Sequence, residues 1–168
     1  MDAEAGTGKK PSIHCGGPDI ARVARLVAEP APRSLRAADR AAALVAARTC
    51  YDHLAGRLGV AVTEAMLRLG DLRADPPRAF QLTDQGEQRL RALGIDVDAA
   101  RSARRHFTRQ CLDWSERRPH LAGALGAAIA RHFLDRGWVR RIPGTRGLRV
   151  TERGKIGLRE AFSLTWDS

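Results

Sequence analysis

The clearest pattern in the chain is an apolar residue at every fourth position of two segments, 53–70 and 120–137. These residues are Leu54, Leu58, Val62 and Met66 in the first segment and Leu121, Leu125, Ile129 and Phe133 in the second. Because an α-helix turns once in about 3.6 residues, each set lines one side of a helix. The pattern therefore predicts two amphipathic helices, each with one buried stripe.

The same two segments are copies of one another. HLAGRLGVAVTEAMLRLG (53–70) and HLAGALGAAIARHFLDRG (120–137) agree at 9 of 18 positions. After one inserted residue the match resumes, with LTDQG (82–86) against VTERG (150–154). An internal repeat of this length indicates two copies of one supersecondary unit.

Each predicted helix is followed by signals for a hairpin and a further helix. In the second copy, Pro143-Gly144 suits the centre of a type II turn between two short strands. Thr83 and Thr151 suit the N-caps of the final short helices. Helix, hairpin and helix form the back half of a winged-helix module. The expected fold is therefore mainly α with two short β-hairpins, arranged as a tandem winged-helix-like repeat.

Four regions are expected along the chain. They are a disordered or frayed tail at 1–17, N-terminal, dimerisation-like helices at 18–46, a winged-helix-like unit at 47–95, and a linking helix with a second such unit at 96–164.

Two long helices are also expected. The alanine-rich helix of residues 34–49 is predicted to run on through Tyr51. The linking helix is predicted to run from Asp96 to about Trp114.

The charge of the chain is concentrated in its last third. The net charge is +10, and residues 101–168 carry 15 basic side chains against 6 acidic ones, whereas residues 1–100 carry 14 against 13. Such asymmetry favours a polyanionic partner, nucleic acid first. An arginine-rich surface exposed to solvent is the alternative.

Cysteine usage and the absence of several motifs narrow the class of protein. Cys15, Cys50 and Cys111 are widely spaced, without a CxxC pair, which predicts reduced thiols in the cytoplasm. The acidic N-terminus is not a signal peptide, and the longest apolar run is too short for a membrane span. No phosphate-binding glycine loop, HExxH motif or nucleophile elbow is present, so we do not expect an enzyme.

The chain resembles the C-terminal portion of a subgroup of ArsR-type helix-turn-helix transcription regulators, over roughly residues 34–162. The segments that carry the resemblance are ARTCYDHLAGRLGVAV (47–62), LTDQGEQRLRALGID (82–96), RRHFTRQCLDWSERRPHLAGALGAA (104–128) and FLDRGWVRRIPGTRGLRVTERGKIGL (133–158). In that subgroup an N-terminal winged helix binds operator DNA and a dimerisation helix follows it.

The resemblance implies transcription regulation, DNA as a partner and a homodimer. It also implies that the DNA-reading domain is missing from this sequence, so none of the family's DNA-contacting residues is carried over. The alternative is a dimerisation and effector-sensing module that lacks a sequence-specific reader of its own.

Six arginines are the candidate nucleic-acid contacts. They are Arg140, Arg141, Arg146 and Arg149 on the second predicted hairpin, and Arg104 and Arg105 on the linking helix. We expect the hairpin to protrude, because wings of this kind contact phosphate or the minor groove. The alternative is a solvated arginine face that makes local ion pairs.

Four side chains could form a metal site. Cys50 and His53, three residues apart on a predicted helix, would share one face as half a site, and Cys111 and His120 could supply the rest, with Asp113 as a further possible ligand. The repeat alignment places Arg117 opposite Cys50, which predicts that the site is not duplicated. A composite site would then require the two units to bring both cysteines together. The alternative is that the thiols fill the core and the histidines lie at helix starts. No other cofactor is expected.

The aromatic residues Tyr51, Phe107, Trp114 and Trp138 have two interpretations. They could line a small-molecule effector pocket between the two units, or they could pack in the core.

Overall fold

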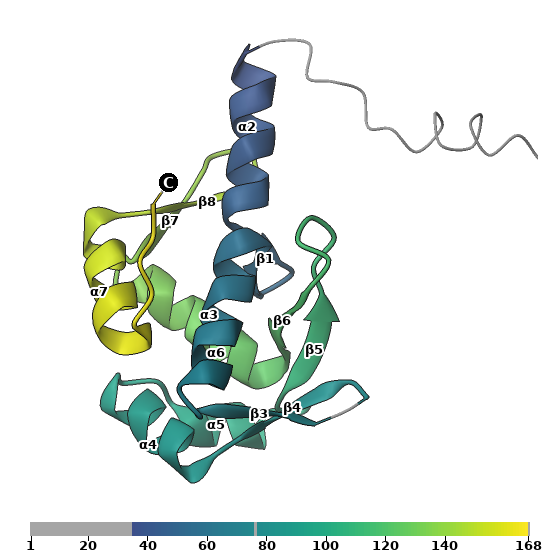
Figure 1. Ribbon diagram of the computed structural model, residues 1–168, viewed down its shortest axis with the longest axis vertical. Coiled ribbons are helices and arrows are strands. Elements are labelled where there is room, and N and C mark those ends of the chain that lie inside the picture. Colours follow the sequence, from purple (N-terminus) through teal and green to yellow (C-terminus); the bar gives the residue numbers. More distant parts are fainter. Residues whose placement is uncertain (1–34, 76, 168) are drawn as a thin grey trace, which may run out of the picture. The chain divides into compact units, whose positions relative to one another are not determined.

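The computed structural model describes residues 35–75 and 77–167 (Figure 1). The chain divides into two units, Met1–Ala31 and Pro32–Ser168, and the described residues belong to the second. The predicted tail at 1–17 and the helix expected from residue 18 lie outside the described residues.

The described elements follow the order hairpin, helix, hairpin, helix twice. The first copy consists of β1 (Arg48–Cys50), β2 (His53–Ala55), α3 (Gly56–Arg68), β3 (Leu72–Asp75), β4 (Ala79–Leu82) and α4 (Asp84–Ala92). The second consists of β5 (Arg109–Leu112), β6 (Pro119–Ala122), α6 (Gly123–Asp135), β7 (Val139–Arg141), β8 (Leu148–Val150) and α7 (Glu152–Phe162). Helix α2 (Leu35–Ala46) precedes the first copy, and α5 (Val97–Ser102) lies between the copies.

The fold is mixed α/β, with small antiparallel sheets of two strands each. The prediction of two hairpins is wrong, because the described residues form four. The two expected hairpins, β3–β4 and β7–β8, are confirmed. The predicted turn at Pro143-Gly144 is also present, since Gly144 has φ +70° and the Thr145 amide donates to the Ile142 carbonyl.

The two unexpected hairpins replace the ends of predicted helices. Helix α2 ends at Ala46, and residues 48–50 pair with residues 53–55 instead of continuing it through Tyr51. Helix α5 ends at Ser102, far short of Trp114. Each replacement has a cause outside the local sequence pattern, because these segments are fixed by contacts with residues farther along the chain.

Residues 103–108 illustrate such a contact. The carbonyls of His106 and Phe107 accept hydrogen bonds from the amides of Ala124 and Leu125 at the start of α6. A segment whose carbonyls are used in this way cannot also form i to i−4 helical bonds. Helix propensity is a weak prior that tertiary contacts override.

The repeated threonine and glycine of the LTDQG and VTERG segments have a packing role. Thr83 and Thr151 are N-caps, as predicted, and their hydroxyls accept hydrogen bonds from the amides of Gly86 and Gly154. A Cβ atom on Gly86 would lie 2.2 Å from the Asp71 carbonyl oxygen, and one on Gly154 would lie 2.0 Å from that of Trp138. Both helices therefore approach the backbone just before β3 or β7 too closely for any side chain at this position.

Replacing Gly154 by Ala is expected to destabilise the protein by about 1–3 kcal/mol, because the added methyl group displaces backbone rather than a flexible side chain. The matched control is Arg153→Ala, one residue earlier and exposed. Urea denaturation of both variants checks this. Equal stability of the two would show that the close approach is not required.

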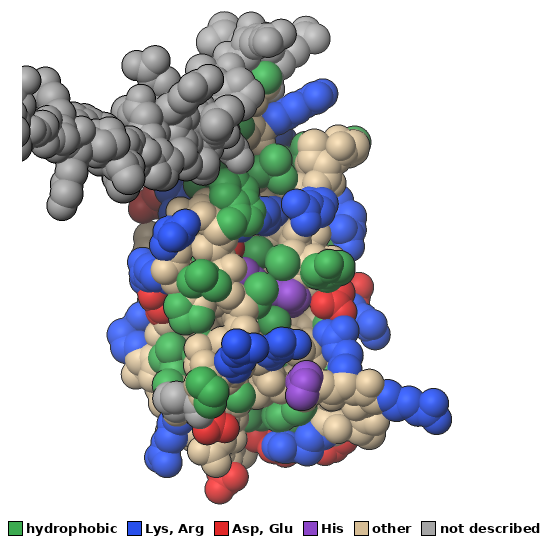
Figure 2. Space-filling view, turned by 90° about the vertical axis from the view of Figure 1, so that its right-hand side faces the viewer, with side chains coloured by type: hydrophobic (Ala, Val, Ile, Leu, Met, Phe, Trp, Pro, Cys, Tyr) green, Lys and Arg blue, Asp and Glu red, His purple; other side chains and the backbone are tan. Residues whose placement is uncertain are grey.

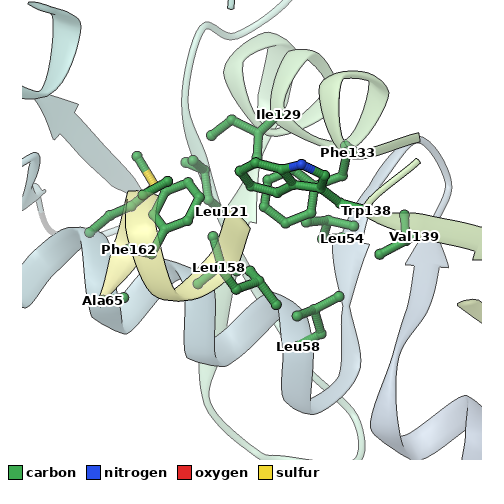
Figure 3. Packing of buried hydrophobic residues seen from close by; sticks show 14 of the residues in the cluster. Leu54, Leu58, Ala65, Leu121, Ile129, Phe133, Trp138, Val139, Leu158 and Phe162 are labelled. Atoms are coloured by element: carbon green, nitrogen blue, oxygen red, sulfur yellow. The ribbon is translucent and has the colours of Figure 1, made fainter. Parts of the chain in front are cut away.

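One hydrophobic core joins the two copies. The predicted stripes are buried throughout, and Leu58, Met66, Leu125 and Phe133 have no exposed surface. Strand β2 packs against α6 of the other copy, and β6 packs against α3. Figure 3 shows Leu54 and Leu58 in the same cluster as Leu121, Phe133, Leu158 and other second-copy residues. The copies therefore stabilise each other.

Among the described helices, none has the length and apolar character required to cross a membrane.

Candidate metal centre

Two equivalent hairpins place the four predicted ligands together. Cys50 is directly opposite His53 in the register of β1–β2, and Cys111 is directly opposite His120 in the register of β5–β6. One possible ligand atom from each of the four residues lies within 4.8 Å of every other. The composite arrangement that the sequence left open is the one that the structure contains.

The predicted local geometry of this site is wrong. Cys50 and His53 are cross-strand neighbours and do not share a helix face. Neither histidine lies at a helix start, because Ala55 and Ala122 are the N-caps of α3 and α6.

The prediction that Cys50 has no counterpart in the second copy is wrong. The turn of the first hairpin contains two residues, Tyr51 and Asp52, whereas the loop of the second contains six, 113–118. Alignment without a gap therefore placed Arg117 opposite Cys50, while the register makes Cys111 its counterpart. The sequence signal that could have identified this is Cys-x-Asp, at 50–52 and again at 111–113.

The two imidazole rings face each other through their Nε2 atoms. These atoms are 3.2 Å apart, and both side chains are buried. Two nitrogen ligands of a tetrahedral zinc ion, each about 2.0–2.1 Å from the metal, would be about 3.3 Å apart. The rings therefore already have the spacing of two zinc ligands.

A carboxylate lies beside the other nitrogen of each ring. Nδ1 of His53 is 3.4 Å from Oδ1 of Asp52. Nδ1 of His120 is 3.2 Å from Oδ2 of Asp113, although without the alignment of a hydrogen bond. Histidines that bind metals commonly donate this N–H to a carboxylate, which fixes the tautomer and directs Nε2 to the ion. Sequence reasoning named Asp113 only as a possible further metal ligand and did not identify Asp52 as part of the site.

Asp113 is the centre of a buried polar network. Its carboxylate accepts two hydrogen bonds of 2.8 Å from Arg48 and one of 2.7 Å from the Gly56 amide at the start of α3. Ser115 donates to it through both its amide and its hydroxyl. Burial alone would raise the pKa of Asp113, but these hydrogen bonds outweigh burial and hold the pKa well below its usual range. Asp113 is therefore ionised at neutral pH.

At neutral pH the two histidines are in the protonation state that binds a metal ion, whereas Cys111 is not. Burial, and then the neighbouring His53, lowers the pKa of His120 to about 4, and burial also lowers the pKa of His53. Both imidazoles are therefore neutral at pH 7 and able to coordinate. Burial, and then the adjacent Cys50, raises the pKa of Cys111 to about 11, so that thiol must lose a proton on binding a metal.

A hollow opens beside the centre. Its volume is about 1230 Å³, and His53 and Cys111 form part of its wall. Figure 2 shows histidine side chains in the middle of one face, between hydrophobic and basic side chains. An ion can therefore reach the ligands from solvent.

The predicted nucleic-acid residues lie on two separate segments of the chain. Arg140, Arg141, Arg146 and Arg149 are exposed on or beside the β7–β8 hairpin, and Arg140 is directly opposite Arg149. Arg104 is exposed after α5. The Arg105 side chain donates hydrogen bonds to Asp52 and to the Gly123 carbonyl.

The β7–β8 hairpin is also less free than predicted. The Leu148 amide donates to the Ala47 carbonyl, and the Thr49 amide donates to the Arg146 carbonyl. These bonds attach one side of the hairpin to β1, so it does not protrude as an isolated ribbon.

The four candidate pocket aromatics separate into different environments. Trp138 is buried in the core, with its ring 4.9 Å from that of Phe133. Phe107 is half-buried against the core and stacks under Arg101. Tyr51 and Trp114 are exposed, and Tyr51 lines the hollow beside the centre.

The chain is similar to a bacterial regulator. It is 42% identical over 118 residues to the protein named uncharacterized HTH-type transcriptional regulator YdfF of Bacillus subtilis (strain 168). The match covers 70% of this chain and 52% of YdfF, so the chain spans about half the length of this relative. No family model and no solved structure matches the chain. The similarity to YdfF supports a regulator family for this protein.

Proposed function

We propose that this chain is the metal-sensing part of a DNA-binding transcription regulator of the ArsR winged-helix type. The observation that carries the proposal is the cluster of Cys50, His53, Cys111 and His120, two ligands from each copy of the repeat. The regulatory role rests on the similarity to a protein named as a transcriptional regulator. The chain acts as a homodimer, as the resemblance to that family implies.

The ligand chemistry favours zinc. Two thiolates and two imidazoles form a Cys₂His₂ set, and Zn²⁺ takes such sets in tetrahedral geometry. Soft thiolate ligands disfavour magnesium and calcium, which prefer oxygen. A hydrogen bond between the two imidazoles would account for their contact, but it would not account for two thiols beside them or for a carboxylate behind each ring.

The position of the site suits a sensor. The four ligands connect β1–β2 to β5–β6, so a bound ion would cross-link the two copies. The Arg48 side chain joins Asp113 behind His120 to the carbonyl of Leu44 in the last turn of α2. Occupancy of the centre is thereby transmitted to the helix that enters the described unit.

Competition titration of the purified chain against a zinc chelator of known affinity tests the proposal. We expect one Zn²⁺ per chain and a rise in melting temperature, because an ion that binds only the folded state stabilises it by mass action. Co²⁺ in place of zinc should give the intense visible absorption of a tetrahedral thiolate site. A chain that binds neither ion at micromolar concentrations would contradict the proposal.

Zinc binding is expected to release protons between pH 7 and 8, because a coordinating thiol must lose its proton and the imidazoles are already neutral. The depressed pKa of His120, about 4, means that this ring contributes no proton in that range. Affinity should therefore fall as the pH falls. Calorimetry in buffers of different ionisation enthalpy measures the proton count, and a count near zero would exclude the cysteines as ligands.

A second candidate function is contact with the DNA backbone. No ion pair within the described residues involves Arg140, Arg141, Arg146 or Arg149, so their charges are free to meet phosphate. This observation favours the β7–β8 hairpin over the solvated-face alternative.

The double variant Arg140→Ala/Arg141→Ala is expected to weaken binding to duplex DNA and to make it less sensitive to salt. Each lost phosphate contact should reduce the log–log salt slope by about 0.9. The matched control is Arg153→Ala/Arg159→Ala on α7, which removes the same charge elsewhere. Fluorescence anisotropy at several salt concentrations measures both, and identical slopes for the two variants would exclude the hairpin.

A further inference from the structure

The hollow beside the metal centre has features that metal binding does not use. Its polar wall contains three arginines, Arg78, Arg105 and Arg109, but one acidic residue, Asp52. Asp52 is already paired with Arg105 and lies against His53. The hollow therefore carries an excess of positive charge.

A bound metal ion leaves this excess unchanged. Two thiolates cancel the charge of a divalent cation, and both imidazoles are neutral. Side chains alternate along a strand, so Arg109 lies on the same face of β5 as Cys111. Arg109 also lines the hollow, and it has no acidic partner among the described residues. Guanidinium groups bind carboxylates with two parallel hydrogen bonds.

The rim of the same hollow is apolar. Tyr51 and Leu112 are 93% and 67% exposed, and both line it. Tyr51 and Leu112 therefore supply the large apolar side chains of this rim. Pro119 and Ala122 extend the apolar lining. Large apolar side chains grouped on a surface indicate a binding site.

The backbone at Tyr51 supports this interpretation. Its φ is +58°, in the left-handed region that bulky side chains disfavour and that asparagine or glycine usually occupies in a two-residue hairpin turn. A tyrosine here costs stability without burying its ring. Strain of this kind is found at functional sites.

We propose that this hollow binds a small organic anion with an apolar body, such as an aromatic carboxylate, as a second ligand beside the metal. The arginines pair with the carboxylate, and Tyr51 and Leu112 cover the apolar part. The proposal goes beyond metal sensing. It rests on the proposed function only in that a bound metal ion would form part of the wall of the hollow. Binding pockets for small molecules combine such apolar linings with a few convergent polar groups.

Three probes separate the two contributions. 2-Naphthoate has both the charge and the apolar body, 2-naphthamide lacks the charge, and acetate lacks the body. Calorimetry and melting temperature are measured with each probe on the full chain, both zinc-loaded and zinc-free. We expect 2-naphthoate to bind at least about tenfold more tightly than the amide, because a hydrogen bond to a charged group contributes about 1.5–3 kcal/mol. Acetate should not bind measurably.

Two variants test whether Arg109 and Leu112 form the proposed anion site. Arg109→Gln should reduce naphthoate affinity about tenfold and leave the weak naphthamide binding unchanged. Leu112→Ser should weaken both probes. Arg153→Gln, an exposed arginine on α7 outside the hollow, is the matched control and should behave as the wild type.

The outcomes distinguish this inference from the proposed function. Equal binding of naphthoate and naphthamide, or naphthoate binding that Arg109→Gln does not reduce, would overturn the anion site whether or not zinc binds. Naphthoate binding that depends on Arg109 in a chain without zinc affinity would support the anion site and contradict the metal centre. Melting temperatures of the variants without probe show that each is folded.

Discussion

Replacing both Cys50 and Cys111 by Ser is expected to reduce zinc affinity by more than about 10⁴-fold. Structural zinc sites bind with an apparent free energy of about 10–16 kcal/mol, which corresponds to roughly 3 kcal/mol for each of four ligands. Each single Cys→Ser variant should therefore bind zinc more than about a hundredfold more weakly than the wild type. Removing either thiol leaves three protein ligands, so a water molecule would have to complete the tetrahedron.

The chain offers a matched control for this experiment in its third cysteine. Cys15 lies outside the described residues, and Cys15→Ser should bind zinc as the wild type does. His53→Gln extends the test to the imidazoles and should also reduce zinc affinity by more than about a hundredfold. If either cysteine of the proposed pair can be replaced without loss, the four residues do not act as one site.

Replacing Asp113 by Ala is expected to destabilise the fold by about 3–5 kcal/mol, because it leaves the charge of Arg48 buried without a partner. Arg48 is 2% exposed, and its guanidinium makes both of its carboxylate contacts with Asp113. The variant also removes the acceptor of the Gly56 amide at the start of α3. Chemical denaturation of the zinc-free chain measures the effect separately from metal binding.

Two comparisons make that result specific to the buried pair. Asp98→Ala also removes an aspartate paired with an arginine, but on the exposed surface, and should have a much smaller effect. The double variant Arg48→Met/Asp113→Ala should lose less stability than the sum of the single variants, because it leaves no unpaired charge. Strict additivity would show that the two side chains do not depend on each other.

The parts of the fold that sequence predicted are those set by local pattern. The stripes of α3 and α6, the caps at Thr83 and Thr151, and the turn at Pro143-Gly144 depend on residues within a few positions of one another. These interactions are present in any context that buries the apolar face. The sequence alone was therefore sufficient to place them.

The parts that sequence did not predict depend on distant contacts. The β1–β2 hairpin follows an alanine-rich helix, and the local pattern gives no reason to end that helix at Ala46. The reason is Arg48, whose partner Asp113 is 65 residues away. The β5–β6 hairpin was interpreted as helix for a similar cause, since the carbonyls before it bond to the start of α6.

The sequence predicted the residues of the candidate site but not how they pair. The residue types Cys50, His53, Cys111 and His120 indicated a metal, and their chemistry does not depend on the fold. Their pairing was hidden by the longer loop at 113–118, which moves Cys111 out of alignment with Cys50. Asp113 was named only as a possible further ligand, because its role beside His120 follows from the hairpin register.

X-ray absorption at the zinc edge of the loaded chain tests the central claim most directly. The account predicts about two sulfur neighbours at about 2.3 Å and two nitrogen neighbours at about 2.0–2.1 Å, from the two cysteines and two histidines. A shell of oxygen and nitrogen neighbours without sulfur would contradict it.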